Sequence, residues 1–124
     1  MNKLIIKKCN SCNAMVKVLE DCNCNDCGIS CCGEPMVELK PNSTDAAVEK
    51  HVPTFEISGS EIIVRVNHPM EKEHYIQWIS LVHENKEITT QLFPEQNAEV
   101  IFPYMPNSTI YAYCNKHGLW KKDI

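Results

Sequence analysis

The residues best suited to chemistry in this sequence are cysteines and histidines, and the cysteines are unevenly distributed. Of the eight cysteines, one lies close to the C-terminus, at Cys114. The other seven all lie within the first 32 residues: Cys9, Cys12, Cys22, Cys24, Cys27, Cys31 and Cys32. Thiols at this density either bind a metal or form disulfides. Metal binding is favoured, because the only apolar run at the N-terminus is residues 4–6 and we therefore expect no secretory signal.

Four of the five histidines could share one metal with Cys114: His51, His68, His74 and His117. Imidazole suits iron, copper and zinc, and a single thiolate adds a soft, electron-donating ligand for redox chemistry. Five protein ligands would leave one octahedral position open, as a catalytic metal requires. From spacing alone, two interpretations are equally open: the histidines share one metal site, or they are separate residues without a ligand role. A single C-x-x-H tetrapeptide is weak support for a site. His83 falls in a predicted turn and is expected to be a solvated loop residue.

Charge and hydropathy limit the possible partners. The net charge is −4, and the lysines are too scattered to form a basic arm, so we expect binding neither to nucleic acid nor to anionic lipid. No segment approaches the roughly 18 consecutive apolar residues of a membrane span. We therefore expect a cytoplasmic protein in which thiols remain reduced and available to metals.

The chain is expected to fold as two domains, residues 1–38 and 39–124. The first has too few apolar side chains for a core of its own, and units shorter than about 40 residues generally need a metal or disulfides. After a turn at Pro41 and Asn42, a cap at Ser43 or Thr44 predicts one or two helical turns that end by His51.

The rest of the chain has the short, regularly spaced apolar runs of an antiparallel β domain. Strict alternation over residues 74–81 places Ile79 on one face and Ile76 on the other. The predicted strands cover residues 54–57, 61–66, 75–82, 87–93, 98–104 and 109–114. The predicted fold class is thus mainly β.

Five motifs in the same order resemble the superoxide reductase family, and the two-domain layout resembles desulfoferrodoxin. They span residues 9 to 120 and comprise the first C-x-x-C, CCGEPM at 31–36, EKHVP at 49–53, HPMEKEHYIQWI at 68–79 and YCNKHGLW at 113–120. The resemblance implies a desulforedoxin-like N-terminal domain and an immunoglobulin-like β-sandwich. It also implies a homodimer.

The resemblance assigns a role to each residue of the C-terminal motifs. It implies a catalytic iron held by four equatorial histidines and an axial cysteine, which match His51, His68, His74, His117 and Cys114. In the EKH motif, Glu49 matches a ligand of the resting ferric iron, and Lys50 matches the residue that attracts and protonates the substrate. The implied reaction is one-electron reduction of superoxide to hydrogen peroxide, with rubredoxin as the suggested electron donor.

The N-terminal site has two candidate ligand sets. The resemblance favours Cys9, Cys12 and the adjacent pair Cys31 and Cys32, holding iron or zinc. A zinc-ribbon-like spacing instead combines the first C-x-x-C with Cys24 and Cys27, and the role of Cys22 stays open. The alternative function is a non-catalytic iron or zinc module for electron transfer or binding, which would need only these N-terminal thiolates.

Overall fold

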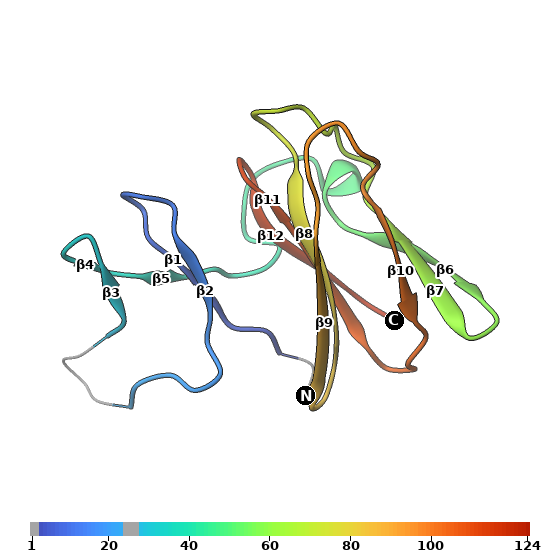
Figure 1. Ribbon diagram of the computed structural model, residues 1–124, viewed down its shortest axis with the longest axis horizontal. Helices are drawn as coiled ribbons and strands as arrows, with labels where there is room; N and C mark the ends of the chain where they lie inside the picture. The colour runs from blue at the N-terminus through green and yellow to red at the C-terminus, as the bar shows by residue number, and fades with distance from the viewer. Residues whose placement is uncertain (1–2, 24–27) are drawn as a thin grey trace. The chain divides into compact units, whose positions relative to one another are not determined.

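The computed structural model describes residues 3–23 and 28–124, and they form an almost entirely β structure (Figure 1). The predicted fold class is therefore confirmed. The chain forms two compact units, Leu4–Lys40 and a larger one that contains Pro41–Ile124. Within the described residues, no helix is long and apolar enough to cross a bilayer.

The N-terminal unit consists of very short strands around a small core. A three-stranded sheet has the order β2-β1-β5, and β3 pairs with β4. The strands are β1 (Ile6–Lys8), β2 (Met15–Lys17), β3 (Ser30–Cys31), β4 (Glu34–Pro35) and β5 (Val37–Glu38). Its buried apolar residues are few: Leu4, Ile6, Cys9, Val18 and Met36. This core is too small to stabilise the unit alone, as the sequence predicts.

The C-terminal unit consists of two antiparallel sheets with a common core. One sheet, in the order β10-β7-β6, contains β6 (Thr54–Ser58), β7 (Glu61–Arg65) and β10 (Glu99–Pro103). The other, in the order β12-β11-β8-β9, contains β8 (Ile76–His83), β9 (Lys86–Gln91), β11 (Thr109–Cys114) and β12 (Gly118–Asp123). Fully buried side chains from both sheets pack together, among them Ile62, Phe102, Leu81 and Ile110. Cys114 belongs to the same cluster.

Two local predictions, the cap of the helical turn and the exposure of His83, were wrong, and one strand was not predicted. The strand β12 was missed, because its Lys-Lys ending interrupts the apolar pattern. The predicted helix is a single 3-10 turn, η1 (Val48–Lys50), with Ala47 as N-cap and no side-chain cap. His83 is not a solvated loop residue: it pairs with Lys86 at the end of the β8–β9 hairpin, and its Nδ1 is buried without a hydrogen-bond partner among the described residues.

The alternation predicted for β8 fails where the strand begins. Its pairing with β11 shifts by one residue between Trp78 and Ile76, so Gln77 is a bulge residue. Ile76 is consequently buried in the same core as Ile79, although strict alternation placed them on opposite faces. The bulge redirects the chain just after His74.

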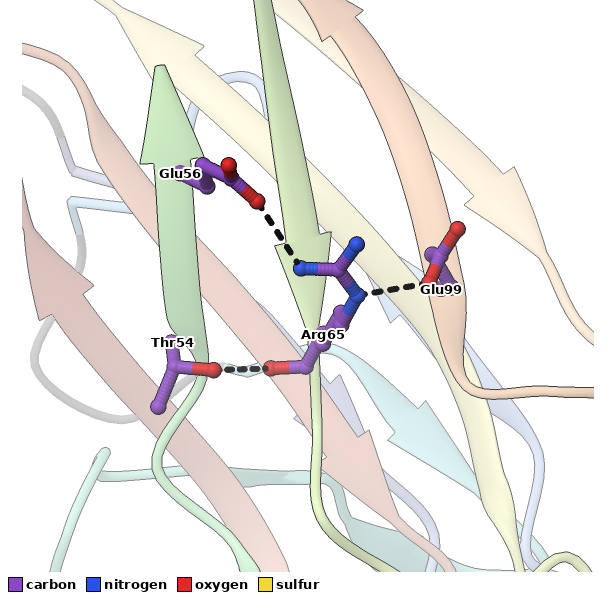
Figure 2. Close-up of polar contacts among 4 residues, drawn as sticks. All are labelled: Thr54, Glu56, Arg65 and Glu99. Carbon is purple, nitrogen blue, oxygen red and sulfur yellow. Dashed lines mark hydrogen bonds and ion pairs between the residues drawn. The ribbon is translucent and has the colours of Figure 1, made fainter. Parts of the chain in front are cut away.

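In the C-terminal unit, an ion-pair network joins the strands of the β10-β7-β6 sheet near the end of β7 (Figure 2). Arg65 Nε donates to Glu99 on β10 at 2.7 Å, and its Nη1 contacts Glu56 on β6 at 3.4 Å. The Thr54 hydroxyl donates to the Arg65 carbonyl at 3.3 Å. These side chains are exposed, so solvent screens the ion pairs and each adds little to stability.

Gly118 permits the tight turn between β11 and β12. Its φ is +83°, and an added Cβ would lie 2.6 Å from Thr44 Oγ1. Gly59, in the β6–β7 turn, also has a positive φ (+61°), but it has open space around it.

We expect Gly118→Ala to destabilise the C-terminal unit more than Gly59→Ala. Backbone strain should cost about 1–3 kcal/mol in either variant, and the contact with Thr44 should add about 1 kcal/mol in the first alone. Urea unfolding of the metal-free proteins, followed by fluorescence of Trp78 and Trp120, measures the difference. Equal unfolding midpoints for the two variants would contradict the steric part of this explanation.

Candidate metal centres

The antiparallel topology of the C-terminal unit brings five candidate ligands to one end of the sandwich. His51 precedes β6 and His68 follows β7, and these strand ends pair directly through Thr54 and Arg65. In the other sheet, His74 precedes β8, while Cys114 ends β11 and His117 lies in the turn before β12. Neighbouring antiparallel strands start and end at the same edge. Residues far apart in sequence therefore meet here.

The four histidine rings form a closed cycle. The centroid distances are 4.8 Å for His51–His68, 4.6 Å for His68–His74, 5.0 Å for His74–His117 and 4.8 Å for His117–His51. Each ring meets the next edge to face, with interplanar angles between 63° and 88°. One donor atom from each histidine and the Cys114 sulfur all lie within 4.8 Å of one another.

The spacing of the donor atoms suits one metal ion. His117 Nδ1 lies 3.1 Å from His51 Nε2 and 3.3 Å from His74 Nε2. Two nitrogens bound at right angles, about 2.1 Å from a metal, would be about 3.0 Å apart. Cys114 Sγ lies 3.3 Å from His68 Nε2. The residues present therefore fit a cation bound by four imidazoles and one thiolate.

Backbone carbonyls orient two of these rings. His51 Nδ1 lies 2.7 Å from the Ala47 carbonyl, and His68 Nδ1 lies 2.5 Å from the Pro69 carbonyl. A proton on each Nδ1 satisfies these bonds and leaves the Nε2 lone pairs directed at the common centre. His117 instead uses Nδ1, the nitrogen nearer the backbone, since it follows Cys114 by only three residues.

Trp120, to which the sequence analysis assigned no role, is buried and supports the centre. Its ring stacks on His51 at 5.0 Å with an interplanar angle of 20°. Its Nε1 donates to the His117 carbonyl at 3.0 Å. The YCNKHGLW motif was the available signal, because it places this tryptophan three residues after His117.

Burial favours the uncharged form of the donors. It lowers the pKa of His68 and the pKa of His74, with a smaller contribution from neighbouring histidines in both cases. Burial also raises the pKa of the Cys114 thiol. Neutral imidazoles keep their lone pairs available, and a bound cation would offset the cost of burying the thiolate.

Glu49 and Lys50, the other two predicted site residues, lie next to His51. Both belong to the 3-10 turn η1 and are exposed. They are therefore accessible to solvent beside the ligand cluster.

The N-terminal unit contains a second cluster, formed by Cys9, Cys12, Cys31 and Cys32. The Sγ–Sγ distances are 3.6 Å between Cys12 and Cys31 and 3.9 Å between Cys31 and Cys32. Four sulfurs at about 2.3 Å from a tetrahedral metal would be about 3.8 Å apart. None of these cysteines forms a disulfide. The cluster therefore fits a tetrahedral thiolate site.

Backbone N–H groups prepare this second cluster for a metal. Those of Cys12 and Ser11 lower the pKa of Cys9 to about 7. The neighbouring thiols, first Cys12 and then Cys9, raise the pKa of Cys31 to about 12. Because the later protons leave with difficulty, a cation is needed to gather four thiolates at this spacing.

Of the rival ligand set, Cys24 and Cys27 lie outside the described residues. Cys22 is exposed, and its backbone N–H donates to the side chain of Asp21 at 2.9 Å. In the described part of the chain, the adjacent pair Cys31 and Cys32 lies beside Cys9 and Cys12.

The chain is similar to known proteins over most of its length. The family model for Desulfoferrodoxin matches residues 43–123. A desulfoferrodoxin of Syntrophotalea carbinolica is 41% identical over 126 aligned residues, covering 98% of this chain and 97% of that protein. A superoxide reductase of Pyrococcus horikoshii is 31% identical over 112 aligned residues, covering 72% of this chain and 97% of that protein. The crystal structure of the superoxide reductase from Treponema pallidum matches with a TM-score of 0.74 at 27% identity, covering 97% of this chain and 98% of that one.

The geometry predicts that histidines of the cycle, and not His83, determine metal binding in the C-terminal unit. We expect His51→Ala to lower iron affinity at least about 10-fold, because it removes a donor. The matched variant His83→Ala should leave the affinity unchanged. Competition with a chelator, followed by iron analysis of the full chain, measures both. Equal iron content in the two variants would contradict the assigned donor set.

Proposed function

The chain belongs to the desulfoferrodoxin family, and on this premise we propose that it is a superoxide reductase that converts superoxide to hydrogen peroxide. The observation that supports this most is the closed cycle of four histidine rings with the Cys114 sulfur beside it. This donor set combines neutral nitrogens with one electron-donating thiolate, which suits a redox metal more than a purely structural one. We propose residues 39–124 as the catalytic domain.

We propose that His51, His68, His74, His117 and Cys114 hold the catalytic iron. Iron bound there would supply one electron to superoxide, which takes up two protons to become hydrogen peroxide. The role of Cys114 is to direct electron density towards the metal from within the apolar core, where its side chain is fully buried. The carbonyl bonds of His51 and His68 hold the ring proton on Nδ1 and leave Nε2 as the nitrogen that binds a metal.

Lys50 and Glu49 are proposed to act on the substrate and on the resting centre. Lys50 offers an exposed positive charge beside the ligands of a chain with net charge −4, and such local potential raises the encounter rate of a small anion. It would also deliver a proton to the reduced substrate. Glu49 would provide a carboxylate ligand once the centre is oxidised.

We propose residues 1–38 as a desulforedoxin-like domain whose four thiolates bind iron or zinc and hold the small unit together. The fit of the sulfur spacing supports this role. The rival function, a non-catalytic metal module, would need these thiolates alone. From the family resemblance we further propose a cytoplasmic homodimer that receives electrons from rubredoxin.

The products of the reaction test the proposed activity. Superoxide mixed with the reduced, iron-loaded protein should yield hydrogen peroxide equal in amount to the superoxide consumed, without dioxygen, whereas dismutation releases dioxygen. Cys114→Ser should slow the reaction, because the buried thiolate is lost. A protein that takes up only zinc under anaerobic iron reconstitution would instead support the non-catalytic module.

Lys50→Ala should lower the second-order rate constant for superoxide about 10-fold and flatten its dependence on ionic strength, since local steering is screened by salt. Lys86→Ala is the matched control, because Lys86 lies at the far end of the β8–β9 hairpin. Pulse radiolysis at several salt concentrations measures both variants. A rate constant for Lys50→Ala equal to that of the wild type would remove this residue from the mechanism.

A further inference from the structure

We propose that Asn115 is a positioning residue that holds His74 in register with Cys114 and His117. Asn115 lies in the turn between β11 and β12. In the sequence it directly follows the ligand Cys114 and precedes the ligand His117 by two residues. Its side chain reaches a separate segment, residues 73–75, which carries the third ligand, His74. This inference rests on the proposed metal centre, but it is independent of which substrate that centre reduces.

The side-chain amide of Asn115 bonds the backbone on both sides of His74. Its Nδ2 donates to the Glu73 carbonyl at 2.9 Å, and its Oδ1 accepts from the Tyr75 N–H at 3.0 Å. The backbone N–H of Asn115 also donates to the Tyr75 carbonyl at 3.3 Å. One residue thus makes three hydrogen bonds to the segment that contains the ligand.

Glu71 completes the hydrogen bonding of the two peptide groups that flank His74. The Glu71 carbonyl accepts from the His74 N–H at 3.2 Å, and the Glu71 N–H donates to the His74 carbonyl at 3.0 Å. All four polar atoms of these peptide groups are therefore bonded, two to Glu71 and two to the side chain of Asn115. Fixing both peptide planes fixes φ and ψ of His74 and the direction of its Cα–Cβ bond.

A side chain is needed here because the backbone ladder ends too early. The regular pairing of β8 with β11 stops at Ile76 and Cys114. Beyond Cys114 the chain must turn to bring His117 to the same centre, so β11 cannot continue alongside His74. An asparagine amide carries N–H donors and a carbonyl acceptor on one planar group, so a single side chain can bond both a carbonyl and an N–H and replace the missing pairing. The distance of 3.3 Å between His74 Nε2 and His117 Nδ1 depends on this link.

Cobalt(II) titration of the full chain tests the proposal. The thiolate-to-cobalt band that disappears in Cys114→Ser belongs to the C-terminal centre. This variant therefore distinguishes that band from the absorption of cobalt bound to the N-terminal thiolates. In Asn115→Ala this band should shift, and the cobalt affinity of the C-terminal centre should fall about 10- to 100-fold, as for other partners that orient metal ligands. Asn115→Asp should recover part of the affinity, because it keeps the acceptor for the Tyr75 N–H.

Asn42 provides a matched control. Its side chain also bonds one N–H and one carbonyl, both of Lys121, at 2.9 Å and 3.4 Å in the same unit. Asn42→Ala should lower the thermal stability of the metal-free protein and leave the cobalt band and affinity unchanged. This result would show that a general loss of stability does not reproduce the effect of Asn115→Ala.

Two outcomes would overturn the proposal for Asn115 and leave the proposed metal centre intact. One is an unchanged cobalt band and affinity in Asn115→Ala, and the other is an equal shift of the band and loss of affinity in Asn42→Ala. A wild-type protein without any Cys114-dependent cobalt band would overturn the proposed metal centre itself, and this inference with it. The two failures are therefore distinguishable in one series of titrations.

Discussion

The C-terminal unit depends on one constraint, the convergence of five electron-pair donors within 4.8 Å at one end of a packed sandwich. Nitrogen lone pairs directed at each other across 3.1 Å and 3.3 Å repel unless a proton or a metal lies between them. Burial disfavours protonation of His68 and His74, so a metal ion is the natural counter-charge. The core of the sandwich opposes this repulsion, because moving any ligand would disturb the strand that presents it.

The two metal clusters relate to their surroundings in opposite ways. In the C-terminal unit a large apolar core, which includes Cys114, holds the strands that present the donors. Among the described residues of the N-terminal unit the buried apolar ones are few, and the four thiols bring together the segments that carry Cys9, Cys12 and the pair Cys31 and Cys32. A metal there would act chiefly as a cross-link, whereas in the larger unit the packed core also holds the segments that carry the ligands.

Irregularities of the sheets coincide with the ligands. The bulge at Gln77 lies three residues after His74, the positive φ of Gly118 directly follows His117, and the 3-10 turn η1 ends directly before His51. Regular pairing cannot direct side chains from two sheets to one point, so each strand is interrupted where its ligand is presented. Side-chain bonds from Asn115 and Trp120 replace part of the backbone pairing that these interruptions remove.

The sequence by itself indicated the candidate donors and most of the strands of the C-terminal unit. Turn residues, a proline after His51 and alternating apolar runs are local signals, and the five motifs are specific enough to indicate a family. The strand β12, the shifted register of β8 and the burial of His83 Nδ1 could not be predicted, because each is decided by packing and by pairing with a distant segment. Which nitrogen each histidine presents, the closure of the ring cycle and the stacking of Trp120 on His51 likewise required the tertiary structure. Donor identity is a property of single residues, whereas the direction of a lone pair depends on how both sheets hold the backbone around it.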